Sequence, residues 1–265
     1  MHRTLILFFI LLLSLPAVGA QSDKDSAKET LETAEEVLEA NLEATGGRSA
    51  WEAIQSLERT GLRINDSPMG GGKMTSTFVE TIQYPGYLHN SSEMETQMGT
   101  MNIVRVITPE ESWVEAGPIG RREMPLEPNL NLEGPSAELT LLTSSEFSIA
   151  GMTTDTFEGR EVYVVTVDVA GVELQRYYDQ SNLMLLAAER GGADGAEPEL
   201  VKYGDYREVD GLLFSFEQDE EVTMRMISRD ASGNETETLR RGDATVTIEN
   251  IRLNPNVDTT LFSNE

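Results

Sequence analysis

The chain has 265 residues, with 46 acidic against 20 basic side chains, and its formal net charge is −26 at pH 7. This charge argues against nucleic-acid binding, which needs basic surface, and against docking to the anionic headgroups of a membrane. The absence of cysteine excludes disulfides, thiolate metal sites and cysteine nucleophiles.

The first twenty residues have the pattern of a secretory signal peptide. A basic start precedes an apolar run from Thr4 to Val18, and small residues at Val18 and Ala20 indicate cleavage after Ala20. The apolar run is shorter than the roughly 20 residues that a membrane-spanning helix needs. We therefore expect export, with residues 21–265 forming a single domain.

Two helices are predicted at the start of the exported chain. Apolar residues recur with helical spacing over Ser26–Ala44, and the paired glycines Gly46 and Gly47 end the pattern. A second, short helix is expected over Ala50–Leu57. The apolar faces of the two helices carry Leu38, Leu42, Trp51 and Ile54.

From Leu57 onward the apolar period changes to two, and turn signals recur about every ten residues. This pattern predicts ten or eleven antiparallel strands. We expect residues 117–140 to be irregular, apart from a short helix near Ala137–Leu142, and residues 230–243 to form a polar loop. The fold class is therefore α+β and mainly β: a large curved antiparallel sheet covered by N-terminal and short helices.

The inventory of catalytic groups is small. His89 is the only histidine after the signal peptide, which excludes a two-histidine metal site and leaves a Ser-His-Asp triad strained. The glycines before Lys73 lack the spacing of a phosphate-binding loop and are typical of a hairpin turn. Adjacent carboxylates such as Glu110 and Glu111 are expected by chance among 46 acidic residues. We predict no enzyme activity, no catalytic residue, no metal and no cofactor.

Six of the eleven methionines lie between residues 69 and 124. Methionine is flexible and polarizable, which suits a surface that accepts variable apolar shapes, although ordinary core packing is the alternative. The predicted lining of an apolar cavity is Met74, Phe78, Met94, Met98, Met101 and Trp113. Arg121 and Arg122 are predicted to lie at its rim and meet an anionic headgroup, or else to occupy an exposed turn.

Four segments of the sequence suggest a known family. They are Glu36–Leu57 (EVLEANLEATGGRSAWEAIQSL), Tyr177-Tyr178-Asp179, Tyr203–Phe216 (YGDYREVDGLLFSF) and Ile248–Asp258 (IENIRLNPNVD). Together they resemble outer-membrane lipoprotein-sorting proteins of the LolA-like superfamily, and the resemblance spans roughly residues 30–262.

The resemblance implies an incomplete antiparallel barrel whose hollow is covered by a helical lid. It also implies a periplasmic carrier, expected to be a monomer, that shelters the acyl chains of lipoproteins or another lipid. Such a carrier receives its load from an inner-membrane ABC transporter and delivers it to an outer-membrane acceptor. The helices bearing Leu38, Leu42, Trp51 and Ile54 would form the lid. Two alternatives stay open: a β-sheet interaction or assembly module with a filled interior, and an unrecognised hydrolase.

Overall fold

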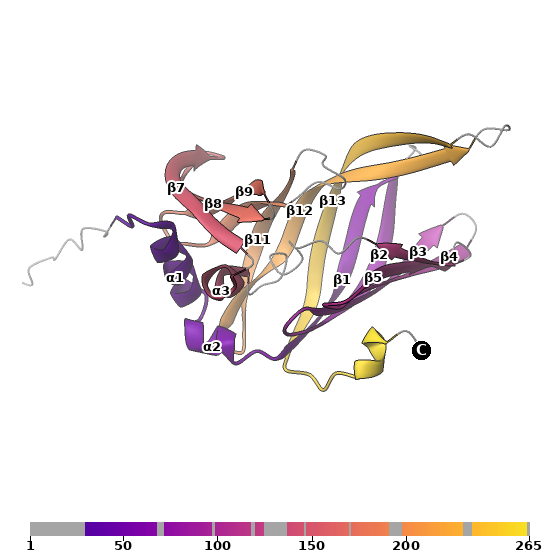
Figure 1. The fold of residues 1–265 in the computed structure, drawn as a ribbon, viewed down its shortest axis with the longest axis horizontal. Coiled ribbons are helices and arrows are strands. Elements are labelled where there is room, and N and C mark those ends of the chain that lie inside the picture. The colour runs from indigo at the N-terminus through magenta and orange to yellow at the C-terminus, as the bar shows by residue number, and fades with distance from the viewer. Residues whose placement is uncertain are drawn as a thin grey trace, which may run out of the picture. The chain divides into compact units, whose positions relative to one another are not determined.

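Thirteen antiparallel strands pair in one continuous curved sheet that does not close into a barrel (Figure 1). The computed structural model describes residues 30–67, 72–96, 99–117, 120–124, 137–145, 147–169, 171–190, 198–229 and 235–263. The predicted signal peptide and Met98 lie outside these residues. Leu31–Glu265 forms one unit by its internal contacts.

The strands follow a simple topology. Their bounds are β1 (Ser56–Asp66), β2 (Lys73–Gln83), β3 (Tyr87–Thr96), β4 (Gly99–Ile107), β5 (Ser112–Ala116), β6 (Gly120–Met124), β7 (Phe147–Phe157), β8 (Arg160–Val169), β9 (Val172–Asp179), β10 (Leu185–Arg190), β11 (Glu199–Val209), β12 (Leu212–Arg229) and β13 (Glu235–Leu253). The order in the sheet is β6-β5-β4-β3-β2-β1-β13-β12-β11-β10-β9-β8-β7. The first and last strands therefore pair in the middle of the sheet, and the two edges come from the middle of the chain.

The structure has more strands than the ten or eleven predicted. β6 lies in the stretch expected to be irregular, and β13 begins at Glu235, inside the predicted polar loop. Both segments are rich in charged residues, so their sequences carry no apolar alternation. Pairing with β5 and β12 supplies the partners that make them strands.

The first helix, α1 (Ala34–Ala44), begins later than the predicted Ser26. Thr33 caps it: the Thr33 hydroxyl accepts from the Glu36 backbone N–H at 3.2 Å, and the Glu36 carboxylate accepts from the Thr33 backbone N–H. This reciprocal pair satisfies backbone donors at the helix start, which fixes the start at Ala34. The helix ends at the predicted glycines, where the Gly47 N–H donates to the Leu42 carbonyl at 2.8 Å.

The two remaining α-helices are short. α2 (Arg48–Glu52) ends before Leu57, which belongs to β1 rather than to the predicted helix. α3 (Ala137–Thr143) coincides with the short helix expected near Ala137–Leu142. No helix among the described residues is both long and apolar enough to cross a bilayer.

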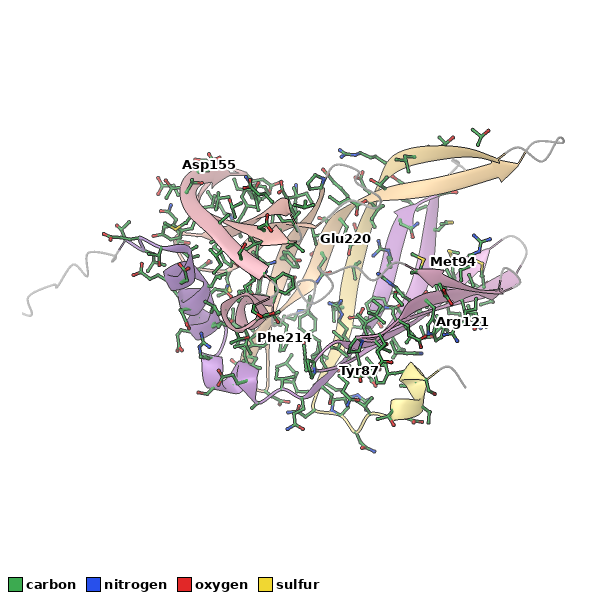
Figure 2. The ribbon with its side chains drawn as sticks, in the orientation of Figure 1. Tyr87, Met94, Arg121, Asp155, Phe214 and Glu220 are labelled. Carbon is green, nitrogen blue, oxygen red and sulfur yellow. The ribbon has the colours of Figure 1, made fainter. Side chains whose placement is uncertain are left out.

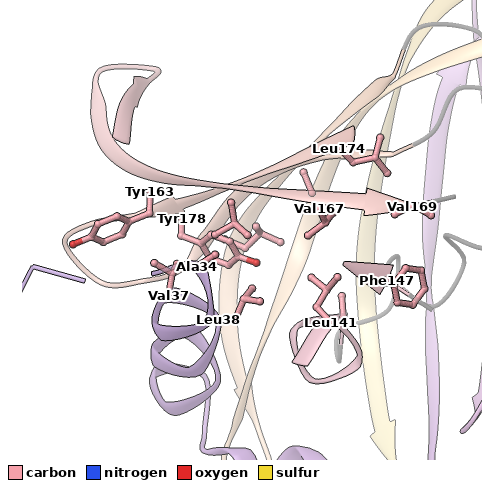
Figure 3. Packing of buried hydrophobic residues seen from close by; sticks show 14 residues of the cluster. Ala34, Val37, Leu38, Leu141, Phe147, Tyr163, Val167, Val169, Leu174 and Tyr178 are labelled. Carbon is pink, nitrogen blue, oxygen red and sulfur yellow. The ribbon is translucent and has the colours of Figure 1, made fainter. Parts of the chain in front are cut away.

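Two apolar clusters hold the helices against the sheet. In the first, Leu38 of α1 and Leu141 of α3 pack on Val165 and Val167 of β8 (Figure 3). In the second, Leu42 and α2 pack on Leu57 and on residues of β2, β12 and β13. We call the face that carries Leu57 the inner face of the sheet. Burial of these apolar side chains is the main force that folds the helices onto the strands.

The opposite, outer face is covered in part by the C-terminal 3-10 helix η4 (Thr259–Phe262). The ring of Phe262 lies 5.4 Å from that of Tyr87 on β3.

Candidate ligand-binding site

The four residues predicted for a lid are all buried against the sheet. Leu38 belongs to the first apolar cluster, and Leu42, Trp51 and Ile54 belong to the second. Trp51 lies edge-on to Phe214 of β12, with the ring centroids 5.1 Å apart. The four side chains therefore face the strands, and their role as a lid stays a prediction.

Helices α1 and α2, which carry three of the predicted lid residues, are also held by polar contacts at their ends. The Trp51 indole N–H donates to the Thr45 hydroxyl at 3.0 Å, and the Leu213 backbone N–H donates to the Thr45 carbonyl at 2.9 Å. Gly46 approaches the β11–β12 turn so closely that a Cβ there would lie 2.5 Å from the Gly211 carbonyl oxygen. The segment between α1 and α2 is therefore fixed to one end of β12.

A buried polar network joins α3 to β9. Glu138 of α3 forms an ion pair with Arg176 of β9, and the two side chains are only 8% and 4% exposed. The Tyr178 hydroxyl donates to Glu138 at 2.9 Å and accepts from the Arg176 Nε–H at 2.9 Å. Burial raises the pKa of Tyr178 well above its ordinary value, so its phenol stays protonated and available as a donor. We call Glu138, Arg176 and Tyr178 the α3 latch.

The sequence reading did not single out the α3 latch. The sequence does contain a signal for it, because Glu138 is the one acidic residue in an otherwise apolar and threonine-containing helix. A charge at such a position is buried only when a partner neutralises it. The identity of that partner depended on the tertiary pairing of segments 38 residues apart.

A small cavity lies between the lid helices and the sheet. Its walls include Trp51, Leu57 and Phe214, together with Glu138 and Arg176 of the latch. Its volume is about 70 Å³. An engineered apolar cavity of roughly 150 Å³ binds benzene. The space between the helices and the sheet is smaller than that cavity.

The predicted methionine lining lies elsewhere on the same face of the sheet. The strand register places Met74, Phe78, Met94 and Met101 on the inner face of β2, β3 and β4. Phe78 also reaches the second apolar cluster, and its ring lies across Gly61 of β1. Helices α1 and α3 contact β7 or β8 at the other side of the sheet, and Met74, Met94 and Met101 belong to neither apolar cluster (Figure 1). We call Met74, Phe78, Met94 and Met101 the methionine patch.

Trp113 does not lie with the methionine patch. It pairs with Val106 of β4, which in turn pairs with His89 of β3, so all three side chains point to the outer face. The Arg121 guanidinium lies over the Trp113 ring, 3.6 Å from its centroid, on that outer face. Arg122 pairs with Val114 and points to the inner face. Figure 2 labels Arg121 and Met94 in this part of the sheet. The two arginines predicted at one rim thus lie on opposite faces.

Within the described part of the chain, no group of three or more histidine or carboxylate side chains is arranged to hold a metal ion.

The fold is shared with solved structures. A LolA superfamily protein from Nitrosomonas europaea superposes with a TM-score of 0.55 at 13% identity, over 88% of this chain and 99% of that one. The chain has a LolA-like fold. A DUF1329 family protein from Desulfovibrio piger superposes with a TM-score of 0.53 at 8% identity, over 88% of this chain and 98% of that one. No protein-family model matches the sequence, and no curated protein matches it in sequence.

Proposed function

We propose that this LolA-like chain is an exported, non-enzymatic carrier that shelters acyl chains of lipoproteins or another lipid in the periplasm. The observation that carries the proposal is a curved, open sheet whose inner face packs, within the described residues, against α1, α2 and α3 through two apolar clusters. The signal-peptide pattern at residues 1–20 and the shared fold support it. An inner-membrane ABC transporter and an outer-membrane acceptor are the partners that we propose for loading and delivery.

The energetics of such a carrier require a lid that opens. Burying a 16-carbon chain is worth on the order of 12 kcal/mol before costs, at about 0.8 kcal/mol per methylene. Ordering the chain and opening the lid consume part of this gain. Release then needs a partner that binds the open form better than the closed one. The 70 Å³ cavity is consistent with the closed, empty form of this cycle.

The same small cavity is the specific observation that favours one alternative, an interaction module whose interior is filled by its own side chains. A binding experiment separates the two. The exported chain, residues 21–265, would be stripped of lipid and titrated with 1-palmitoylglycerol against a fluorescent apolar probe such as 1-aminoanthracene. A carrier binds the probe and releases it to the lipid, whereas a filled module takes up neither.

Tryptophan fluorescence reports on the lid in the same titration. The chain has two tryptophans, and Trp113 lies on the outer face, so the variant Trp113→Phe leaves Trp51 as the only tryptophan, which is excited selectively over the seven tyrosines at about 295 nm. Trp51 is 3% exposed in the closed form. Lipid binding beneath a moving lid should change its emission. A bound lipid that leaves Trp51 emission unchanged would show that the ligand lies away from the lid.

A further inference from the structure

Charges on strands β2–β6 are sorted between the two faces of the sheet. The register sends four carboxylates to the outer face: Glu93, Glu95, Glu115 and Glu123. The inner face of these strands carries one carboxylate, Glu80, and it is ion-paired with Arg59 of β1. In a chain of net charge −26, the inner face of this region is therefore not acidic.

Two arginines remain on that inner face. Arg105 of β4 and Arg122 of β6 both pair with Val114 of β5, so they flank it from the two neighbouring strands. Strands lie about 4.8 Å apart, which puts the two Cα atoms roughly 10 Å apart. Among the residues that the structure describes, neither arginine has an ion-pair partner, whereas Arg59 and Arg63 are both paired. Two guanidinium groups on long side chains can thus meet at one anion.

The methionine patch begins beside these arginines. Ile103 and then Met101 follow Arg105 on the inner face of β4, and Met101 lies about 13 Å along the strand from Arg105. Met74, Met101 and Ile103 are partly exposed, whereas Phe78 and Met94 are buried, each with 9% exposure. The inner face of β2–β6 therefore combines a flexible apolar surface with a pair of unmatched cations at one end.

We propose that this surface binds an acyl lipid with a phosphate headgroup, with the chain on the methionine patch and the phosphate between Arg105 and Arg122. A carboxylate presents one edge to a guanidinium fork, whereas a terminal phosphate has three oxygens and can engage two forks at once. The proposal rests on the carrier function above, adds the headgroup class, and places the bound chain on the methionine patch rather than in the cavity between the helices and the sheet.

Three ligands with the same palmitoyl chain test the assignment on the exported chain: 1-palmitoyl lysophosphatidate, 1-palmitoylglycerol and palmitate. Each is titrated below its aggregation limit against bound 1-aminoanthracene. We expect the phosphate lipid to bind at least about tenfold more tightly than 1-palmitoylglycerol, since charge-assisted hydrogen bonds distinguish the two. Arg105→Gln and Arg122→Gln should each remove about tenfold of the phosphate affinity and leave 1-palmitoylglycerol binding unchanged.

Arg121→Gln is the matched control, because it removes the same charge from the outer face one residue away. It should leave all three affinities unchanged, and thermal melts confirm that each variant is folded. Equal binding of the phosphate and neutral lipids, or equal losses in all three variants, would overturn the headgroup site while leaving the carrier function intact. Palmitate binding as tightly as the phosphate lipid would overturn the preference for phosphate. Failure of every ligand to bind would overturn the carrier function itself.

Discussion

The α3 latch allows a quantitative test of how α3 is held against the sheet. In Glu138→Gln the carboxylate is lost but its shape is kept, so the Arg176 guanidinium stays buried without a counter-charge. Breaking a buried pair in this way costs about 3–5 kcal/mol, and the retained amide oxygen places the variant near the lower limit. The expected loss of unfolding free energy is therefore about 3 kcal/mol.

The same loss should appear locally in α3. If α3 detaches from β9 before the sheet unfolds, a change of about 3 kcal/mol raises its open population roughly a hundredfold. Urea denaturation followed by circular dichroism measures the global effect, and amide hydrogen exchange in Ala137–Thr143 measures the local one. Faster displacement of a bound apolar probe would connect the opening of α3 to ligand exchange.

Two further variants make this reasoning refutable. Glu39→Gln removes a carboxylate that pairs with Arg48 at the surface, where the side chains are 45% and 30% exposed, and should cost less than about 1 kcal/mol. Replacing both latch charges, by Glu138→Leu with Arg176→Met, should recover part of the stability, because no charge is left buried, although the Tyr178 hydroxyl loses both partners. A Glu138→Gln loss as small as that of Glu39→Gln, or a double variant less stable than Glu138→Gln, would show that the latch does not hold α3.

Three other predictions follow from local geometry. Gly61→Ala would place a Cβ 2.1 Å from a carbonyl oxygen of β13 and should lower the unfolding free energy, measured by urea denaturation, by roughly 2–4 kcal/mol. Gly204→Ala is the control and should be almost neutral, because the nearest neighbour atom of its Cβ would lie 4.0 Å away. Equal losses in the two variants would contradict the close approach at Gly61. Burial lowers the pKa of His89, so its contribution to stability is complete above about pH 6.5 and declines as the pH falls through the lowered pKa. His89→Gln should therefore lose less stability than the natural chain between pH 7 and pH 5.5, and identical losses would refute a buried neutral imidazole. Leu42→Ala removes a side chain that is 1% exposed and should lower the unfolding free energy, measured by heat or urea, by about 2–5 kcal/mol. Leu239→Ala, at a side chain 51% exposed, should change it by no more than about 0.5 kcal/mol. Similar effects in the two variants would refute tight packing of α1 on the sheet.

Local sequence patterns predicted the elements that have a clear apolar period. The apolar stripe through Leu38 and Leu42 predicted α1, and Gly46 and Gly47 predicted its end. The apolar alternation from Leu57 onward predicted most of the strands. The beginning of α1 was wrong because the capping pair of Thr33 and Glu36 outweighs the apolar spacing that continues before it. β6 and the beginning of β13 were missed because charged strands carry no period of two.

The candidate site was predictable only in part, for a similar reason. Residues on the same side of one helix share a face whatever the fold, so the burial of Leu38 and Leu42 could be derived from spacing. Trp113 and Met94 belong to different strands, and whether they share a face depends on the register between those strands. The partner of Glu138 depends on which strand α3 covers, and no local pattern of the sequence contains that information.

The sequence by itself determined the acidic character of the chain, the absence of cysteine chemistry, the apolar stripe of the lid and the antiparallel, mainly β architecture. These properties are sums over residues or repeats along a short segment. The tertiary structure alone decided that Arg121 and Arg122 separate to opposite faces and that Arg105 and Arg122 flank one valine. It also decided that, among the described residues of β2–β6, every carboxylate except Glu80 lies on the outer face. The physical reason is that net charge is independent of conformation, whereas the potential at a surface depends on which side chains the strand register brings together.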